Sequence, residues 1–216
     1  ITDSYATPAN LHDSRPYLDR LDRQCERFGF DVWGVGLDAG YYTAGICKGL
    51  EDRGLYGVMG YRRPNKPKGY LPKRAFTYDP ETNSYRCPQG QQLIYATTNR
   101  LGYREYKSNP TNCKDCPLLS QCTRSANHVK VLTRHVWQDS KDRTDSYRLT
   151  PWGKALYKRR QETVERSFAD AKQLHGHRYA RLRGLSKVRE QCLLAAAAQN
   201  MKKIAKILAR LLWLKS

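Results

Sequence analysis

The spacing of apolar positions changes several times along the first sixty residues, and each spacing predicts a different element. An amphipathic helix is predicted to start at Arg15–Pro16 and to extend to about Arg27, and apolar residues recur there at helical intervals: Tyr17, Leu18, Leu21, Cys25 and Phe28. A short apolar run over 31–37 predicts a buried strand, a helix follows over about 43–53, and a second strand covers about 55–59. Strand, helix and strand with short joints predict a parallel βαβ unit.

The pattern changes between residues 62 and 149, where Pro, Gly, Lys, Tyr and Thr dominate and helical periodicity is absent. Short β-prone pieces occur there, so we predict a mostly β insertion. Helix resumes at 150, with Thr150 as N-cap and Pro151 at the first helical position, and is predicted to extend to about Leu174. We expect its inner face to carry Val164, Phe168 and Ala171, close to Glu165.

A last amphipathic helix is predicted over about 186–214, and we expect it to cover one face of a sheet. The predicted fold class is therefore α/β. Residues 1–61 form the first part of the core, 62–149 form a β-rich, cysteine-containing insertion, and 150–216 supply the C-terminal helices of the core.

The charge balance favours a polyanionic partner. The chain has 39 Lys and Arg against 20 Asp and Glu, a net charge of +19. Nucleic acid is the commonest partner of so basic a protein, although a ribosome-associated or simply basic protein is the alternative. No apolar run approaches the ~20 residues that a membrane-spanning helix needs. The densest basic stretches are Arg62–Lys68, Lys73–Arg74, Lys158–Arg160 and His175–Arg183.

Two acidic residues stand out in this basic chain. Asp38 follows the apolar run that ends at Leu37, so a buried strand is expected to present its carboxylate at the C-terminal tip. Glu165 lies among Arg and Lys residues on the predicted helix, and Lys172 follows it two turns later. Two-metal phosphoryl transfer needs about three converging acids, and Mg²⁺ suits an all-oxygen site. The plainer alternatives are a turn-forming Asp and a helix with surface ion pairs.

Four stretches together resemble bacterial insertion-sequence transposases of the DDE type, of the IS4/IS5-like superfamily. They are Ala6–Ser14, Gly36–Tyr41, Glu162–Lys172 and His177–Leu185. The resemblance spans nearly the whole chain and implies a ribonuclease-H-like catalytic core, Mg²⁺ or Mn²⁺ as cofactor, and DNA as partner, both the element ends and the target. It implies a homo-oligomer on DNA and a cytoplasmic, nucleoid-associated location in bacteria.

The resemblance also implies roles for single residues. Asp38 matches the second catalytic Asp, Glu165 matches the catalytic Glu, and Lys172 matches the Lys seven positions later. Tyr157 and Arg160 match a Tyr and an Arg that help to position DNA, but here both lie one residue further from Glu165 than is usual in that group. Further DNA contacts are expected from nearby basic side chains: Arg159, Arg166, Arg181 and Arg183.

The first catalytic Asp of such transposases has no match in the chain. It belongs on a strand upstream of Ala6, where Asp3 lies too close to the motif, and Asp13 belongs to a helix start. The chain also begins without Met. We therefore expect a C-terminal fragment that does not cut DNA alone.

Four of the seven cysteines cluster between positions 87 and 122: Cys87, Cys113, Cys116 and Cys122. A Cys-x-x-Cys pair with two further thiolates can complete a closed, tetrahedral Zn²⁺ site, which predicts structural zinc. Free thiols and an iron–sulfur cluster are the alternatives. An odd cysteine count without an export signal indicates reduced thiols.

The predicted function is that of a DNA transposase fragment, acting by metal-dependent strand cleavage and strand transfer. Two alternatives stay open: a non-catalytic, zinc-containing nucleic-acid-binding module, and a related nuclease that does not transpose.

Overall fold

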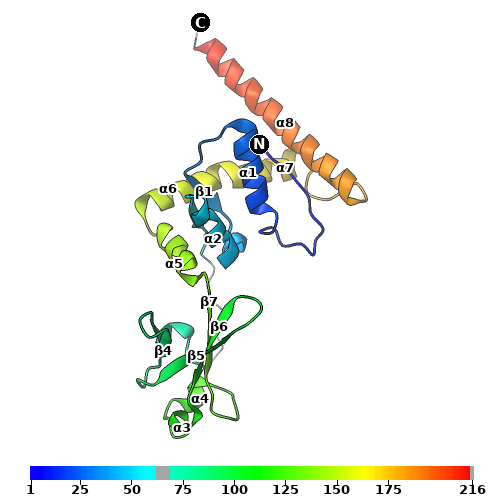
Figure 1. The fold of residues 1–216 in the computed structure, drawn as a ribbon. Helices are drawn as coiled ribbons and strands as arrows, with labels where there is room; N and C mark the ends of the chain where they lie inside the picture. Colours follow the sequence, from blue (N-terminus) through cyan, green and yellow to red (C-terminus); the bar gives the residue numbers. More distant parts are fainter. Residues whose placement is uncertain (62–68, 215–216) are drawn as a thin grey trace. The chain divides into compact units, whose positions relative to one another are not determined.

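The computed structural model describes residues 1–61 and 69–214, and the chain divides into two compact units (Figure 1). The first unit comprises Ile1–Tyr61 and Ser140–Ser216, and the second comprises Arg62–Asp139. The predicted insertion extended to residue 149, whereas the second unit ends at Asp139. Helix α5 (Gln138–Tyr147) accounts for the difference, because the hydroxyl of Tyr42 donates a hydrogen bond of 3.1 Å to the carbonyl of Lys141.

The first unit contains the predicted parallel pair of strands. Strand β1 (Gly34–Leu37) pairs in parallel with β2 (Tyr56–Met59), and helix α2 (Ala44–Asp52) connects them. Helix α1 (Tyr17–Phe28) precedes this βαβ unit. The predicted order of elements is therefore confirmed. Their buried faces meet in one hydrophobic core, whose most buried members are Leu21, Leu37, Ile46, Cys47, Leu50 and Met59.

Helix α6 (Pro151–Arg160) begins as the sequence predicts, because the hydroxyl of Thr150 accepts a hydrogen bond of 3.0 Å from the amide of Gly153. A π-helical turn (Gln161–Glu165) follows, and α7 (Arg166–Leu174) continues along the same rod (Figure 1). The predicted helix therefore has the expected extent, but one of its turns is π-helical.

Two glycines of β1 allow α6 to approach the strand closely. A Cβ atom at Gly34 would lie 3.5 Å from Cδ2 of Leu156, and one at Gly36 would lie 3.3 Å from Cβ of Arg160. A larger side chain at Gly36 would press against the backbone-near atoms of α6, where little can yield. The Gly-x-Gly pattern of the strand thus sets the depth at which α6 packs.

The inner face predicted for this part of the helix is only partly correct. Ala171 is buried, but Val164 is 42% exposed and Phe168 is 59% exposed. The last helix, α8 (Leu185–Trp213), also differs from expectation. It lies beside α7, where Lys203 donates to the Ser167 hydroxyl (3.0 Å), and most of its apolar residues are exposed instead of covering a sheet.

The second unit is an antiparallel five-stranded sheet in sequential order. Its strands are β3 (Thr77–Asp79), β4 (Ser84–Arg86), β5 (Gln92–Thr98), β6 (Tyr103–Ser108) and β7 (Val131–His135). Two one-turn helices, α3 (Pro110–Cys113) and α4 (Leu119–Cys122), lie between β6 and β7. The sheet has its own core, made of Phe76, Tyr85, Leu93, Tyr106 and Leu132.

The chain is thus mixed α/β, with a parallel pair of strands in one unit and an antiparallel sheet in the other. Among the described residues, no helix has both the length and the apolar character required to cross a membrane.

Candidate functional site

Asp38 lies directly after β1, at the C-terminal end of the parallel pair. Its carboxylate accepts a hydrogen bond of 2.7 Å from the amide of Ala39 and so caps the short 3-10 turn Ala39–Tyr41. The side chain is exposed. Asp38 therefore performs the capping role expected of a turn former, through one of its two carboxylate oxygens.

Helix α6 contacts this end of the strands through Tyr157. A Cβ atom at Gly60, the residue after β2, would lie 2.6 Å from the Tyr157 hydroxyl and 3.3 Å from the amide nitrogen of Ala39. The Tyr157 hydroxyl and the backbone of Ala39 therefore both lie close to Gly60, directly after β2. The sequence pattern missed Gly60, although it follows β2 just as Asp38 follows β1, and this equivalence of position was the available signal.

Arg160 connects Glu165 to strand β1. The Arg160 guanidinium forms an ion pair with the Glu165 carboxylate, and its carbon lies 5.6 Å from the centre of the Tyr157 ring. The Arg160 side chain is only 13% exposed, because its stem packs against Gly36, whereas the Glu165 side chain is 51% exposed. The structure thus relates Asp38 to Ala39, Ala39 and Tyr157 to Gly60, Tyr157 to Arg160, and Arg160 to Glu165.

The remaining predicted residues of this helix are exposed. Arg159 lies in the last turn of α6, Arg166 begins α7, and Lys172 lies in the last turn of α7. Lys172 follows Glu165 by seven residues, which is close to two helical turns, so both residues lie on one face of α7. None of these three cations has an ion-pair partner among the interactions of the described residues.

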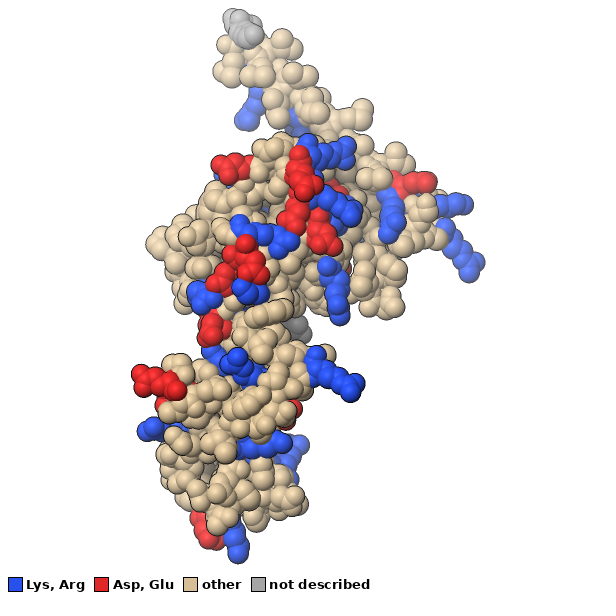
Figure 2. Space-filling view, in the orientation of Figure 1, with Lys and Arg blue, Asp and Glu red and all other residues tan. Residues whose placement is uncertain are grey.

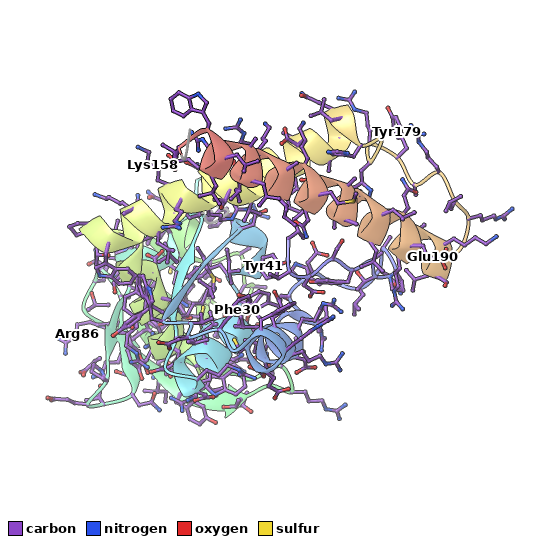
Figure 3. All side chains as sticks on the ribbon, turned by 90° about the horizontal axis from the view of Figure 1, so that it is seen from above. Phe30, Tyr41, Arg86, Lys158, Tyr179 and Glu190 are labelled. Carbon is purple, nitrogen blue, oxygen red and sulfur yellow. The ribbon has the colours of Figure 1, made fainter. Side chains whose placement is uncertain are left out.

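Arg181 and Arg183 lie in the loop between α7 and α8, which also contains Tyr179 (Figure 3). Gln191 of α8 holds this loop from both sides: its oxygen accepts from the amide of Arg181 (2.9 Å), and its nitrogen donates to the carbonyl of Tyr179 (2.8 Å). The loop is therefore an anchored structure that presents exposed arginines. The role of Gln191 gave no separate signal in the sequence.

Basic side chains are spread over the surface. On the face shown in Figure 2, Lys and Arg alternate with Asp and Glu over the first unit and do not form one uniform basic area. Arg62–Lys68, one of the predicted basic stretches, lies outside the described residues. Lys158, on α6, is exposed (Figure 3).

The four clustered cysteines line one cavity of about 280 Å³ in the second unit. Cys87 and Cys122 pack against the core of the sheet, and Cys113 and Cys116 come from the segment between β6 and β7. Burial raises the pKa of the Cys122 thiol, and the other three thiols raise it further, while Lys130 lowers it. Asp115 and His128, which the sequence pattern did not single out, line the same cavity.

Neither predicted metal site is formed as a complete ligand set. Within residues 1–61 and 69–214, no three or more His, Cys, Asp or Glu side chains are grouped closely enough to hold a metal ion. The oxygen ligands Asp38 and Glu165 suit Mg²⁺ chemically, but they are two where about three are needed. The four thiols suit Zn²⁺ in kind and number, but they line their cavity without meeting at one point.

A family model described as a transposase DDE domain matches residues 86–205, more than half of the chain. The chain belongs to this family. The match includes the four clustered cysteines, the α6–α7 rod with Glu165, and most of α8, while Asp38 lies outside the matched residues. No curated protein and no solved structure matches the chain.

Membership of the DDE transposase family confirms the predicted resemblance at the level of the family. It places the chain in the transposase class of enzymes and makes DNA its partner. Enzymes of this class generally use divalent metal ions such as Mg²⁺. The +19 net charge fits a polyanionic partner of this kind.

Proposed function

We propose that the first unit is the catalytic part of a ribonuclease-H-like core, and that the chain derives from a bacterial insertion-sequence transposase of the IS4/IS5-like superfamily. Its activity would be metal-dependent cleavage of DNA strands followed by strand transfer. The observation that carries the proposal is the series of contacts from Asp38 through Tyr157 and Arg160 to Glu165. These contacts support a position for both candidate carboxylates at one end of the strand pair.

In this proposal Asp38 and Glu165 would hold Mg²⁺ or Mn²⁺, which when bound would activate the attacking oxygen and offset negative charge on the phosphate. Arg160 holds the Glu165 carboxylate in place through their ion pair. Lys172 contacts a phosphate oxygen from the next turns of the same helix face. Tyr157 and the exposed arginines at positions 159, 166, 181 and 183 orient the DNA backbone.

The test is DNA cleavage by the product of the whole open reading frame, with Asp38→Asn and Glu165→Gln as variants. We expect each variant to lose cleavage at least a hundredfold while DNA binding is retained. Glu162→Gln is the matched control, because Glu162 is an exposed acid of the same π turn. Unchanged cleavage in Asp38→Asn or Glu165→Gln would overturn the catalytic roles and favour a non-catalytic DNA-binding module.

Strand transfer distinguishes a transposase from a related nuclease. The expected product is a donor DNA end covalently joined to target DNA. Cleavage without joined ends would assign the chain to nuclease activity alone. A chemical cross-linking assay with and without the element ends checks the further proposal that copies of the protein assemble on DNA.

We also propose that this chain alone does not cut DNA, because only two carboxylates of the expected three are identified in it. Metal binding can still be measured on the chain itself. Mn²⁺ should bind weakly, detected by electron paramagnetic resonance, and Asp38→Asn should weaken the binding further. Efficient cleavage by the chain alone would refute this part of the proposal.

A second proposal concerns the cysteine cavity. We propose that Cys87, Cys113, Cys116 and Cys122 close around a structural Zn²⁺, since all four line one cavity although they do not form a ligand set as they stand. The reduced chain should bind one equivalent of Zn²⁺, and Cys113→Ser should weaken binding at least tenfold. Cys25→Ser, outside the cavity, is the control. An iron–sulfur chromophore or absence of binding would reject zinc.

A further inference from the structure

The π turn at Gln161–Glu165 interrupts two regular α-helical segments and lies directly beside the candidate site. Single π turns inside α-helices are rare and occur frequently at functional sites. This π turn changes the directions in which four side chains point relative to one another: Tyr157, Arg160, Glu165 and Lys172.

In a uniform α-helix each residue turns by about 100°, so Arg160 and Glu165, five residues apart, would lie about 140° apart around the axis. Side chains at that separation do not meet. The Arg160–Glu165 ion pair nevertheless forms, because a π turn stacks residue i+5 where an α-helix stacks residue i+4. The ion pair is therefore an observation of the altered facing that is independent of the backbone assignment.

The same rotation affects every residue after the turn. In a uniform α-helix Tyr157, Arg160, Glu165 and Lys172 would spread over about 140° of the helix surface. With the π turn, Glu165 and Lys172 rotate back by about one residue, and the four side chains fall within about 60°. Tyr157 and Arg160 mark the direction of this face, since they contact Gly60 and Gly36 at the strand pair.

We infer that the π turn is a positioning device, which carries Glu165 and Lys172 onto the helix face that contacts β1 and β2. Without it, Glu165 would be directed away from the end of the strands where Asp38 lies. That Glu165 on this helix face helps to hold a metal rests on the proposed function. The position of Glu165 and Lys172 on this helix face does not.

The facing is tested with engineered histidine pairs in the full chain. Two histidines on one helix face bind Ni²⁺, as the i, i+4 pairs of helical metal sites do. The Arg160→His/Glu165→His variant should gain about 5–10 °C in Tm at saturating Ni²⁺, relative to either single variant. Lys202→His/Ile207→His has the same spacing in the regular helix α8 and should gain nothing. Lys202→His/Lys206→His, with i, i+4 spacing in α8, is the positive control.

The functional arm uses deletion of Thr163, an exposed residue inside the π turn. Deletion converts the Arg160–Glu165 spacing to i, i+4, which a uniform α-helix places on one face. Mn²⁺ affinity should stay within about threefold of the parent chain. Deletion of Ala169, which rotates Lys172 to another side of the helix, shows whether removing one residue from this helix still allows the chain to fold. Circular dichroism and Tm establish that each variant is folded.

The outcomes separate the inference from the proposed function. If the Arg160→His/Glu165→His variant shows no Ni²⁺-dependent gain while the α8 positive control does, the facing is wrong and the inference is overturned. If the folded Thr163-deleted chain loses more than about threefold in Mn²⁺ affinity, the positioning role is overturned. If the histidine pair binds but Glu165→Gln leaves Mn²⁺ affinity unchanged, the facing is supported and the proposed metal role of Glu165 falls.

Discussion

Gly60 is the residue at which the contact between α6 and the strand ends can be tested most directly. A Cβ atom there would lie 2.6 Å from the Tyr157 hydroxyl oxygen, which is closer than real Cβ atoms approach other heavy atoms. We predict that Gly60→Ala lowers the free energy of unfolding by about 1–3 kcal/mol through overpacking. Urea denaturation of the parent and variant chains measures the difference.

The Tyr157→Phe background provides the control for this effect, since it removes the oxygen that a Cβ at position 60 would meet. Gly60→Ala should cost clearly less in that background than in the parent chain, and this non-additivity is the signature of a direct contact. Equal costs in both backgrounds would show that the two residues do not touch.

Tyr106 in the second unit gives a prediction about pH. Its hydroxyl donates a hydrogen bond of 2.7 Å to the Asn83 side chain, and burial raises its pKa to about 12. The unfolded chain ionises this group near pH 10, whereas the folded chain keeps it protonated, so stability present below pH 10 is lost as the pH rises through 12. We expect the free energy of unfolding to fall by about 1–3 kcal/mol across this range.

Urea denaturation between pH 9 and 12 measures this fall, and Tyr106→Phe should make it shallower. The variant itself should cost about 1 kcal/mol at pH 7, since Tyr78 still donates to the same Asn83 oxygen. Tyr103→Phe, an exposed neighbour on β6, is the matched control and should leave the pH dependence unchanged. If the free energy of unfolding of Tyr106→Phe fell with pH as steeply as that of the parent chain, the pH dependence could not be assigned to Tyr106.

At the residue scale, the sequence indicated which elements carry the candidate carboxylates but not which contacts hold those side chains in position. Asp38 could be predicted at a strand end because an apolar run stops before it. The position of Gly60 after β2 was a signal in the sequence, but its contact with Tyr157 was not. Gln191 could not be predicted as a site residue, because its role arises from hydrogen bonds to the loop that carries Arg181. Such contacts join segments far apart in the chain, and local patterns contain no information about them.

Helix α6 supplies a prediction at the scale of the element, because a glycine lies in its first turn. Gly→Ala in a helix normally stabilises by up to about 1 kcal/mol. At Gly153, however, a Cβ atom would lie 2.0 Å from the carbonyl oxygen of Tyr147, a backbone atom that cannot move freely. Gly153→Ala should therefore lower the free energy of unfolding by several kcal/mol, about as much as the most destabilising single substitutions do. It should also weaken the hydrogen bond by which Thr150 caps the helix.

Gly45 is the matched control, since it lies in the first turn of α2 and a Cβ atom there meets nothing within 4 Å. Gly45→Ala should leave stability unchanged or raise it by up to about 1 kcal/mol. Thermal and urea denaturation of both variants give the comparison. A Gly153→Ala chain as stable as Gly45→Ala would rule out the close approach of Tyr147.

Elements were predicted well where local signals determine them. The βαβ order and the Thr150 cap follow from apolar spacing and from capping chemistry, which act within a few residues. The π turn was not predicted, because residues 161–165 are compatible with a regular helix and the turn is recognised only by the facing of its neighbours. The exposed apolar surface of α8 was also missed, since periodicity identifies an apolar face but not what it contacts.

At the scale of the whole molecule, the two units have separate hydrophobic cores. Leu50 belongs to the core of the first unit and Leu93 to that of the second, and each is 1% exposed. Truncating a buried Leu to Ala costs about 2–5 kcal/mol. We therefore predict that Leu50→Ala lowers the Tm of the first unit alone, that Leu93→Ala lowers that of the second alone, and that the double variant is additive.

Differential scanning calorimetry should resolve two transitions, and hydrogen exchange followed by mass spectrometry assigns each to its residues. The argument depends on the separate cores, because a cooperative unit unfolds together only when its buried contacts are shared. Residues 1–61 and 140–216 are distant in sequence but belong to one unit, so exchange in β1 and in α6 should accelerate together in Leu50→Ala. If either substitution lowers one common transition for the whole chain, the two cores are energetically coupled and the division into independently unfolding units is wrong.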